Sequence, residues 1–306
     1  MIKRTAAVIA ALALAALLLL PFFVMATHAL MTPEQLYAES APEGVFTGSY
    51  GRGMNILPLP VSLSQFWDIL AYRFEYLFMY WDSLKISVII TAGHLFVSLA
   101  IGYALGRYGF RGSKACFALY VAVLMLPFSV TLLPNYLLIK WLGLYDTQWA
   151  VMLPAIFSPL GALLMAFYIR SLPAELFDAA SLETNSLLVL WTRILAPMVK
   201  PGIIALGILT FSEAWNMVEQ PQVLMESRMI QPLSIALNGL FGKYSPSQFA
   251  GALLYATPVF FLCLIYRDTI MKELTDQETG NGNEASGGCT SLRAFSSRCC
   301  WGLPSA

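Results

Sequence analysis

The sequence predicts an all-α integral membrane protein with six transmembrane helices, and three observations lead to that fold class. The chain of 306 residues is 58% hydrophobic and only 12% charged, against about 25% charged residues in an average soluble domain. Its mean hydropathy is +0.67. The apolar residues also gather into long blocks, and blocks of about 18 or more apolar residues are typical of membrane spans. The formal net charge of +0 gives no indication of a nucleic-acid partner.

Six apolar blocks are interpreted as membrane spans. They cover residues 5–26, 84–105, 115–138, 149–169, 199–218 and 249–266. These blocks divide the chain into an N-terminal transmembrane helix (1–26), an extracytoplasmic loop (27–83), a five-helix core (84–266) and a tail (267–306). The loop contains an aromatic, amphipathic stretch from Phe66 to Phe74, which we expect to lie at the membrane–water interface. The tail is polar and rich in Gly and Ser, so we expect it to be disordered.

The first block has a second interpretation. A basic start, here Lys3 and Arg4, followed by an apolar run is also typical of a signal peptide. The apolar core of a signal peptide is about 7–15 residues long, whereas the run from Thr5 to Ala26 is longer and unbroken. We therefore favour a retained span over a cleaved signal.

The distribution of cations predicts the orientation, because cytoplasmic segments carry an excess of Lys and Arg. With the N-terminus inside, the cytoplasmic segments contain Lys3, Arg4, Arg107, Arg111, Lys114, Arg170, Arg193, Lys200, Arg267 and Lys272. The outer segments contain fewer, namely Arg52, Arg73, Lys85, Lys140, Arg228 and Lys243. We therefore expect a multi-pass protein of the bacterial cytoplasmic membrane with both termini in the cytoplasm.

The inner connector, residues 170–198, carries the most informative motif. It reads Leu-Pro-Ala-Glu-Leu-Phe-Asp-Ala-Ala over residues 172–180 and Ile-Leu-Ala-Pro over residues 194–197. This pattern resembles the EAA loop of ABC-importer permeases, with Asp178, Ala179 and Ala180 in the places of the Glu-Ala-Ala. There are departures from the family pattern, because Thr184 stands at the usual Gly and Ala196 replaces a Leu.

Shorter matches extend the resemblance over roughly residues 58 to 266. They are Asp82-Ser83-Leu84 at the second span, Gly102 to Arg107 at its end, the prolines Pro127 and Pro134, the stretch Gly143 to Thr147, and Trp215-Asn216 with Pro221. Each is weak alone, but their order and spacing resemble the carbohydrate-uptake permeases, in particular the smaller permease subunit of maltose transporters.

The resemblance implies a type I ABC-importer permease fold, in which the inner connector forms a coupling helix that docks on a cytoplasmic ATPase. The residues it assigns to this coupling loop are Pro173, Glu175, Asp178, Ala179, Ala180, Glu183, Ile194 and Pro197. Pro173 suits a first helical turn, and acids are favoured near a helix N-terminus. The alternative is an ordinary cytoplasmic helix between two spans.

The resemblance also implies partners: a second related permease, two ATPase subunits that bind ATP and Mg, and an extracytoplasmic sugar-binding protein. The chain itself lacks a P-loop, which needs G-x-x-x-x-G-K-[S/T]; its Gly-Lys pair, Gly242-Lys243, is followed by Tyr244. We therefore expect no enzymatic activity and no cofactor in this chain.

Polar groups at membrane depth are candidates for the substrate path. Glu213 and Asn216 share one face of the fifth span, and Trp215 beside them offers an aromatic ring to a sugar. The alternative is that Glu213 and Asn216 only bind a neighbouring helix. His94 in the second span is expected to be a packed hydrogen-bond donor rather than a proton relay. No His or Cys partner stands at metal-ligand spacing, so no metal site is predicted.

The predicted function is the permease subunit of an ATP-driven, binding-protein-dependent importer of a sugar or oligosaccharide. Another polar solute, such as a glycerol phosphodiester, is an alternative substrate. An ion-coupled secondary transporter is the alternative by class, but it needs inverted repeats or an ion site, and the chain shows no convincing duplication. The sequence does not identify the sugar.

Overall fold

The structure is a computed structural model that describes residues 2–40, 60–108, 110–173, 175, 177, 193, 195–240 and 247–267. The regular elements of these residues are helices, in agreement with the predicted all-α fold class. The α-helices are α1 (Ile2–Ala29), α2 (Pro33–Ser40), α3 (Ser64–Trp67), α4 (Phe74–Tyr103), α5 (Ser113–Leu124), α6 (Phe128–Trp141), α7 (Trp149–Ile156), α8 (Pro159–Ser171), α11 (Ala196–Met198), α12 (Lys200–Trp215), α13 (Glu219–Leu224) and α14 (Leu233–Leu240). Two π-helical segments, η1 (Asp68–Tyr72) and η2 (Ala104–Tyr108), flank α4, and η4 (Arg228–Ile230) is a 3₁₀ turn.

Four stretches of the described chain are helical, long and apolar enough to cross a membrane: Val8–Ala29, Phe74–Tyr108, Trp149–Ser171 and the last described helix, Gln248–Arg267. They correspond to the first, second, fourth and sixth predicted spans. The second begins at Phe74 instead of residue 84, so the predicted boundary between loop and core, at 83/84, lies inside α4. The predicted interfacial stretch forms α3 and η1 and runs into the start of α4.

The third predicted span is a bent pair rather than one helix. α5 and α6 meet at an angle of 104°, and the break contains Met125, Leu126 and Pro127. Proline lacks a backbone N–H and pushes the residue before it out of the helical region. Pro127 itself is extended, with ψ 143°. The bend therefore has a local cause that was visible in the sequence.

The fifth predicted span is α12, which has only 16 residues. At about 1.5 Å per residue it rises about 24 Å, less than the ~30 Å hydrocarbon core. α12 begins at Lys200, directly before Pro201, and ends at Trp215. The short helix α13 follows after three residues of irregular chain. α12 by itself therefore covers most, but not all, of the depth of a bilayer.

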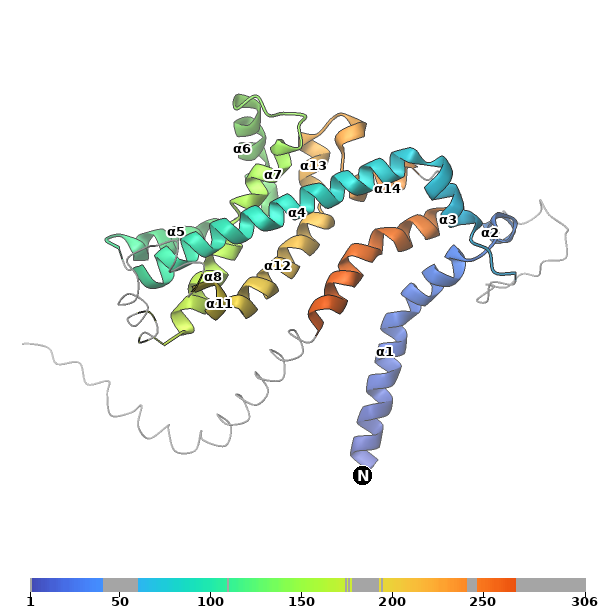
Figure 1. Cartoon of the computed structure of the whole chain (residues 1–306), viewed down its shortest axis with the longest axis horizontal. Helices are drawn as coiled ribbons and strands as arrows, with labels where there is room; N and C mark the ends of the chain where they lie inside the picture. The colour runs from blue at the N-terminus through green and yellow to red at the C-terminus, as the bar shows by residue number, and fades with distance from the viewer. Residues whose placement is uncertain are drawn as a thin grey trace, which may run out of the picture.

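α4 is the central helix of the bundle. It runs along α7, α8 and α12 (Figure 1). The contact with α8 is close because two glycines of α4 face it. A Cβ added to Gly102 would lie 2.5 Å from the Cβ of Met165, and one added to Gly106 would lie 3.0 Å from the carbonyl oxygen of Ala166. The G-x-x-x-G pair therefore serves packing within this chain.

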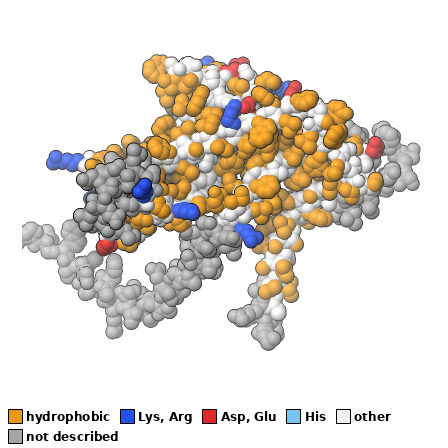
Figure 2. Space-filling view, in the orientation of Figure 1, with side chains coloured by type: hydrophobic (Ala, Val, Ile, Leu, Met, Phe, Trp, Pro, Cys, Tyr) orange, Lys and Arg blue, Asp and Glu red, His pale blue; other side chains and the backbone are white. Residues whose placement is uncertain are grey.

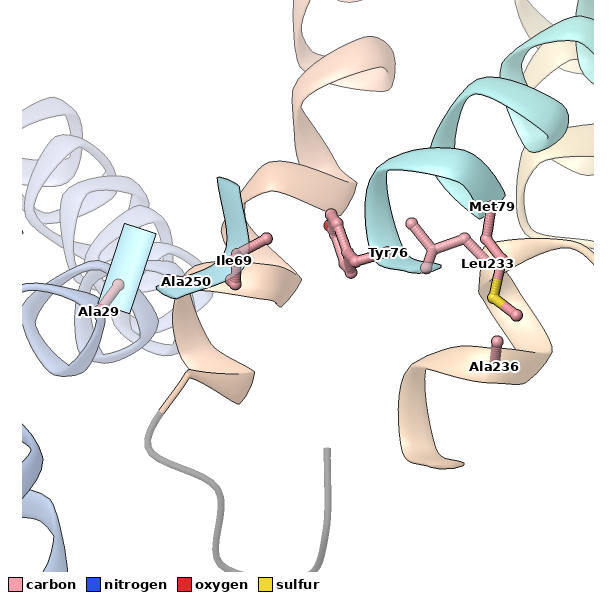
Figure 3. Close-up of a cluster of buried hydrophobic side chains, with 7 residues drawn as sticks. All are labelled: Ala29, Ile69, Tyr76, Met79, Leu233, Ala236 and Ala250. Atoms are coloured by element: carbon pink, nitrogen blue, oxygen red, sulfur yellow. The ribbon is translucent and has the colours of Figure 1, made fainter. Parts of the chain in front are cut away.

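A buried apolar cluster joins five helical elements of the chain (Figure 3). Its residues come from α1, η1, α4, α14 and the last described helix: Ala29, Ile69, Tyr76, Met79, Leu233, Ala236 and Ala250. The Tyr76 hydroxyl donates a hydrogen bond of 2.7 Å to the carbonyl of Gly251. Because each polar group in a span needs a partner, this bond complements the apolar packing.

Helix α1 extends away from the bundle (Figure 1), and none of the apolar window that defines its span is buried. Its large apolar side chains, among them Ile9, Leu17 and Phe22, are more than half exposed. At its C-terminal end the Gln65 amide donates hydrogen bonds to the carbonyls of His28 and Met31. Hydrophobic side chains also cover most of the bundle in view in Figure 2, as expected for a surface that faces lipid.

Candidate functional site

A cavity of about 700 Å³ opens between α4, the bent pair α5–α6, the α7–α8 span and α12–α13. That volume falls within the range of small-molecule sites. Its wall is mostly apolar. The polar side chains on the wall come from five different segments: His94, Thr131, Asn135, Ser158, Thr210, Glu213 and Gln220.

Two helix breaks form part of this wall. One is the bend between α5 and α6, and the other is the break at Phe157 and Ser158, between α7 and α8. The second break again precedes a proline, Pro159, and Ser158 is extended with ψ 136°. Irregular backbone at membrane depth is tolerated where it is buried in protein or lines a water-filled cavity. Both breaks are therefore consistent with a polar passage.

His94 lies on the α4 side of the cavity and is 3% exposed. Its Nδ1 lies 3.0 Å from the carbonyl oxygen of Ile156, the last residue of α7. A carbonyl only accepts, so Nδ1 carries the proton, and Nε2 faces the hydroxyl of Ser98 at 3.4 Å. A side chain at Gly161 would collide with both His94 and Ser98. His94 is thus a packed donor that holds the end of α7, as predicted.

The three predicted substrate-path residues lie in different environments. Glu213 is exposed, lines the cavity, and forms no hydrogen bond or ion pair with any other described residue. Asn216 lies outside the cavity wall, where its amide donates to the carbonyl of Ser212 and its oxygen accepts from the Tyr255 hydroxyl.

Trp215 is 1% exposed and has no free ring face in this structure. Phe211 and Tyr255 stack on it, with centroids at 6.1 and 5.2 Å, and Tyr80 meets it edge-on at 5.5 Å. Trp215 Nε1 donates to the carbonyl of Tyr255, whose hydroxyl donates back to the carbonyl of Trp215. Trp215 therefore ties α12 to the last described helix, and the expected sugar contact is not available to it here.

The sequence interpretation missed Asn135 and Gln220 on the cavity wall. Asn135 lies in α6 directly after Pro134, and the rule that selected Glu213, a polar group at membrane depth, applies to it equally. The side-chain oxygen of Gln220 is buried and has no hydrogen-bond partner among the residues that the structure describes. Gln220 lay outside the predicted spans, so only the packing of α13 against α7 brings it to the cavity.

The described part of the inner connector includes Pro173, Glu175 and Pro197, all of which are exposed. Asp178, Ala179, Ala180, Glu183 and Ile194 lie outside the described residues. Phe177, next to the motif, is buried in a cluster with Ile169, Leu195 and Val199, which we name the Phe177 cluster. Its ring lies 6.4 Å from that of Tyr103, and the guanidinium of Arg107 lies 5.1 Å from its centroid.

Comparison with known proteins places this architecture in a family. No family model matches the chain. The arabinooligosaccharides transport system permease protein AraQ of Halalkalibacterium halodurans is 31% identical over 215 residues, which cover 68% of this chain and 77% of AraQ. The chain belongs to the ABC-transporter sugar permeases. AraQ of Bacillus subtilis (28% identity, 74% of this chain and 81% of AraQ) and the lactose transport system permease protein LacG of Rhizobium radiobacter (28%, 60% and 69%) also match this permease.

A solved structure confirms the fold. It is a bacterial ABC transporter involved in the import of the acidic polysaccharide alginate, and the permease superposes on one of its chains with a TM-score of 0.72. The match covers 87% of this chain and 96% of that chain, at 19% sequence identity. As in its relatives, the role of the permease is transport rather than enzymatic catalysis. Among the described residues, no group of His, Cys, Asp and Glu is arranged to hold a metal ion.

Proposed function

We propose that this permease is one of two membrane subunits of an ATP-driven, binding-protein-dependent importer of a sugar or oligosaccharide, and that the cavity is its part of the translocation path. The observation that carries this proposal is the set of unused hydrogen-bonding groups on the cavity wall. The Glu213 carboxylate and the Gln220 side-chain oxygen have no partner among the described residues. A buried polar atom without a partner, such as the Gln220 oxygen, is costly, and an exposed carboxylate at membrane depth is a candidate for function. Together they indicate that a polar solute occupies the cavity.

The cavity also offers apolar faces beside these polar groups. Phe157, at the α7–α8 break, is 63% exposed and lines the wall, as do Phe128 and Leu126 at the other break. A saccharide has hydroxyl groups around its ring and apolar C–H faces above and below. The combination of aromatic rings with amide and carboxylate groups therefore suits a saccharide. The names of AraQ and LacG, which refer to arabinooligosaccharides and lactose, support the same class of substrate.

The energy comes from partner subunits in this proposal. Two cytoplasmic ATPases bind ATP and Mg, an extracytoplasmic binding protein delivers the sugar, and a second permease completes the path. The ATPase contacts the coupling loop around Asp178, Ala179 and Ala180. Burial of Phe177 supports this assignment, because it anchors the loop directly to α8 and to the residues that lead into α12. A movement of the loop would then reach two elements of the bundle.

Charge reversal in the loop tests the proposal. Asp178→Lys and Ala180→Lys should leave the permease in the membrane at normal levels but abolish ATPase pull-down and binding-protein-stimulated hydrolysis in reconstituted vesicles. Asp178→Glu, which introduces the usual family residue, is the matched control and should be tolerated. Full stimulated hydrolysis and sugar uptake in both Lys variants would refute the coupling role. Failure of two ATPases and a binding protein to co-purify with the native chain would refute the importer itself.

The proposed orientation places the Phe177 cluster in the cytoplasm and the loop that contains Asp146 outside. The two lie at opposite ends of the span Trp149–Ser171. Single cysteines at Ser181 and Thr290 should react with impermeant thiol reagents only from the cytoplasmic side, and one at Ser245 only from outside. External labelling at Ser181 would reverse the topology.

A further inference from the structure

Among the described residues, the cavity wall carries one charged side chain, and its charge is negative. Among the described residues that line the cavity, Glu213 is the only side chain that carries a formal charge with His94 neutral, and no Lys or Arg lies on the wall. His94 contacts the carbonyl of Ile156 with Nδ1 and the hydroxyl of Ser98 with Nε2. The part of the wall that the described residues form is therefore negative.

Nearby cations are engaged elsewhere. Lys140, in the helix that also presents Asn135, lies over the rings of Tyr136 and Tyr145 at 4.7 and 5.0 Å. Lys85, in α4, pairs with Asp82 at 2.6 Å. Since neither reaches the cavity wall, the described chain offers no counter-charge to Glu213.

We propose that the cavity conducts neutral saccharides and disfavours anionic ones, and that Glu213 determines this preference. This inference rests on the proposed function and narrows its substrate class. Sugar hydroxyls can donate to the Glu213 carboxylate and to the Gln220 oxygen, and the Asn135 amide can both donate and accept. A uronate or phosphate group would instead bring a second negative charge close to a carboxylate that has no counter-charge among the described residues, and like charges in a partly solvated cavity repel each other.

The fold does not dictate this selectivity. The structural neighbour with the same fold takes part in the import of an acidic polysaccharide. Acceptance or rejection of acidic sugars must therefore depend on side chains of the path, such as residue 213, rather than on the arrangement of the helices. The same argument disfavours a glycerol phosphodiester as the substrate.

The electrostatic part is tested without knowledge of the natural substrate. In the assembled transporter, Thr131→Cys places a reporter thiol on the cavity wall after the five native cysteines are replaced by serine. We expect a cationic methanethiosulfonate reagent to react about tenfold faster than an anionic one of similar size. The Glu213 carboxylate attracts the cation and repels the anion, and a tenfold ratio is typical of charge–charge energies in a partly solvated site. Glu213→Gln should bring the two rates close together. Glu219→Gln is the matched control, because Glu219 is exposed on α13 outside the cavity wall and should leave the ratio unchanged.

The selective part is tested by protection of the same thiol from a neutral reagent. Arabinotriose should slow the labelling, trigalacturonate should not, and Glu213→Gln should reduce the difference between the two sugars. Equal labelling rates of the two charged reagents, or equal protection by the two sugars, would overturn the inference and leave the importer assignment intact. Protection by neither sugar would mean that the cavity is not a sugar path, and the proposed route and this inference would then fail together.

Discussion

The two ends of the α7–α8 span differ in how much directional side-chain hydrogen bonds contribute to them. Before α7, the loop at Asp146 is held by directional hydrogen bonds in addition to an apolar cluster that includes Val151 and Leu224. After α8, the Phe177 cluster is held by apolar packing and by ring contacts. Both ends belong to one span of the same chain, so the comparison shows two different ways in which a membrane bundle is stabilised.

The Asp146 loop has a specific backbone and side-chain geometry. Asp146 has φ +58°, a left-handed conformation that is uncommon for a residue other than Gly. Its N–H donates to the carbonyl of Leu224 at 3.1 Å. Its carboxylate accepts from the backbone N–H groups of Glu226 and Ser227, each at 2.8 Å, and from the Ser227 hydroxyl. These bonds hold the loop before α7 to the loop after α13 in one arrangement.

The Phe177 cluster, as far as the described residues show it, consists chiefly of apolar side chains and aromatic rings. Phe177, Leu195 and Val199 are buried, and the guanidinium of Arg107 makes a cation–π contact with the Phe177 ring. Apolar contacts and ring faces depend weakly on angle, so they permit small shifts that hydrogen bonds of fixed direction resist. We therefore expect the Asp146 end, where we propose that the binding protein arrives, to resist small shifts more than the Phe177 end, where we propose that the ATPase pushes.

Truncation of the Phe177 ring is expected to have the largest effect. Phe177→Ala leaves a cavity in a buried cluster, and such changes cost about 3–5 kcal/mol in soluble cores. We expect loss of sugar uptake and of binding-protein-stimulated hydrolysis, with basal hydrolysis by the ATPases retained. Phe177→Tyr keeps the ring and serves as the control. Normal coupled transport in Phe177→Ala would show that the cluster does not transmit the movement of the loop.

Removal of the Asp146 carboxylate should have a smaller effect and of a different kind. Asp146→Ala removes all three acceptor contacts and leaves a β-carbon at positive φ, so thermal stability should fall and proteolysis between residues 140 and 230 should accelerate. Asp146→Asn tolerates the same backbone conformation and keeps one acceptor oxygen, so it should lie between Ala and the native protein. Hydrolysis by the ATPases should stay coupled. Uncoupled hydrolysis in Asp146→Ala would erase the contrast between the two ends.

Acid should weaken the Asp146 end selectively. The hydrogen bond from the Ser227 hydroxyl, with the backbone N–H groups of Ser227 and Glu226, lowers the pKa of Asp146 below its usual value. The folded state therefore binds this proton less readily than the unfolded state. The stabilisation is fully present above the usual Asp pKa and is lost as pH falls through the lowered one. The unfolding temperature of the native protein should therefore fall more steeply below about pH 4 than the unfolding temperature of Asp146→Asn. If the unfolding temperatures of the two proteins changed in parallel with pH, Asp146 would not be the cause of the acid sensitivity.

Replacement of Arg170 should have the smallest effect. Arg170, near the end of α8, donates to the carbonyl of Leu105 at 2.9 Å and lies 4.5 Å from the centroid of Phe117. Arg170→Lys keeps the charge but loses the planar group that stacks and donates together. A cost of about 1 kcal/mol is typical of such a contact. The unfolding temperature should decrease slightly while sugar transport is retained. A loss of transport as large as that expected for Phe177→Ala would contradict the proposed ranking.

Much of the fold was accessible from the sequence because its signals are local. Long apolar blocks predict spans wherever they pack, and the first, second, fourth and sixth blocks are helices of spanning length. The prolines at 127 and 159 were visible, but the 104° bend between α5 and α6 was not predicted, since a proline in a span produces anything from a mild kink to a break. The length of α12 was overestimated because apolar composition continues beyond Trp215 while the helix does not.

The sequence by itself determined the class of the protein and, through the order and spacing of short motifs, its family. Only the tertiary structure decided which polar groups share one cavity. Glu213 and Trp215 are two residues apart on α12, yet one lines the cavity and the other is enclosed by aromatic rings. Asn135 and Gln220 join Glu213 from separate helices. In a membrane both the lipid face and the packed face of a helix are apolar, so hydrophobic pattern alone cannot tell which side of a span faces the path.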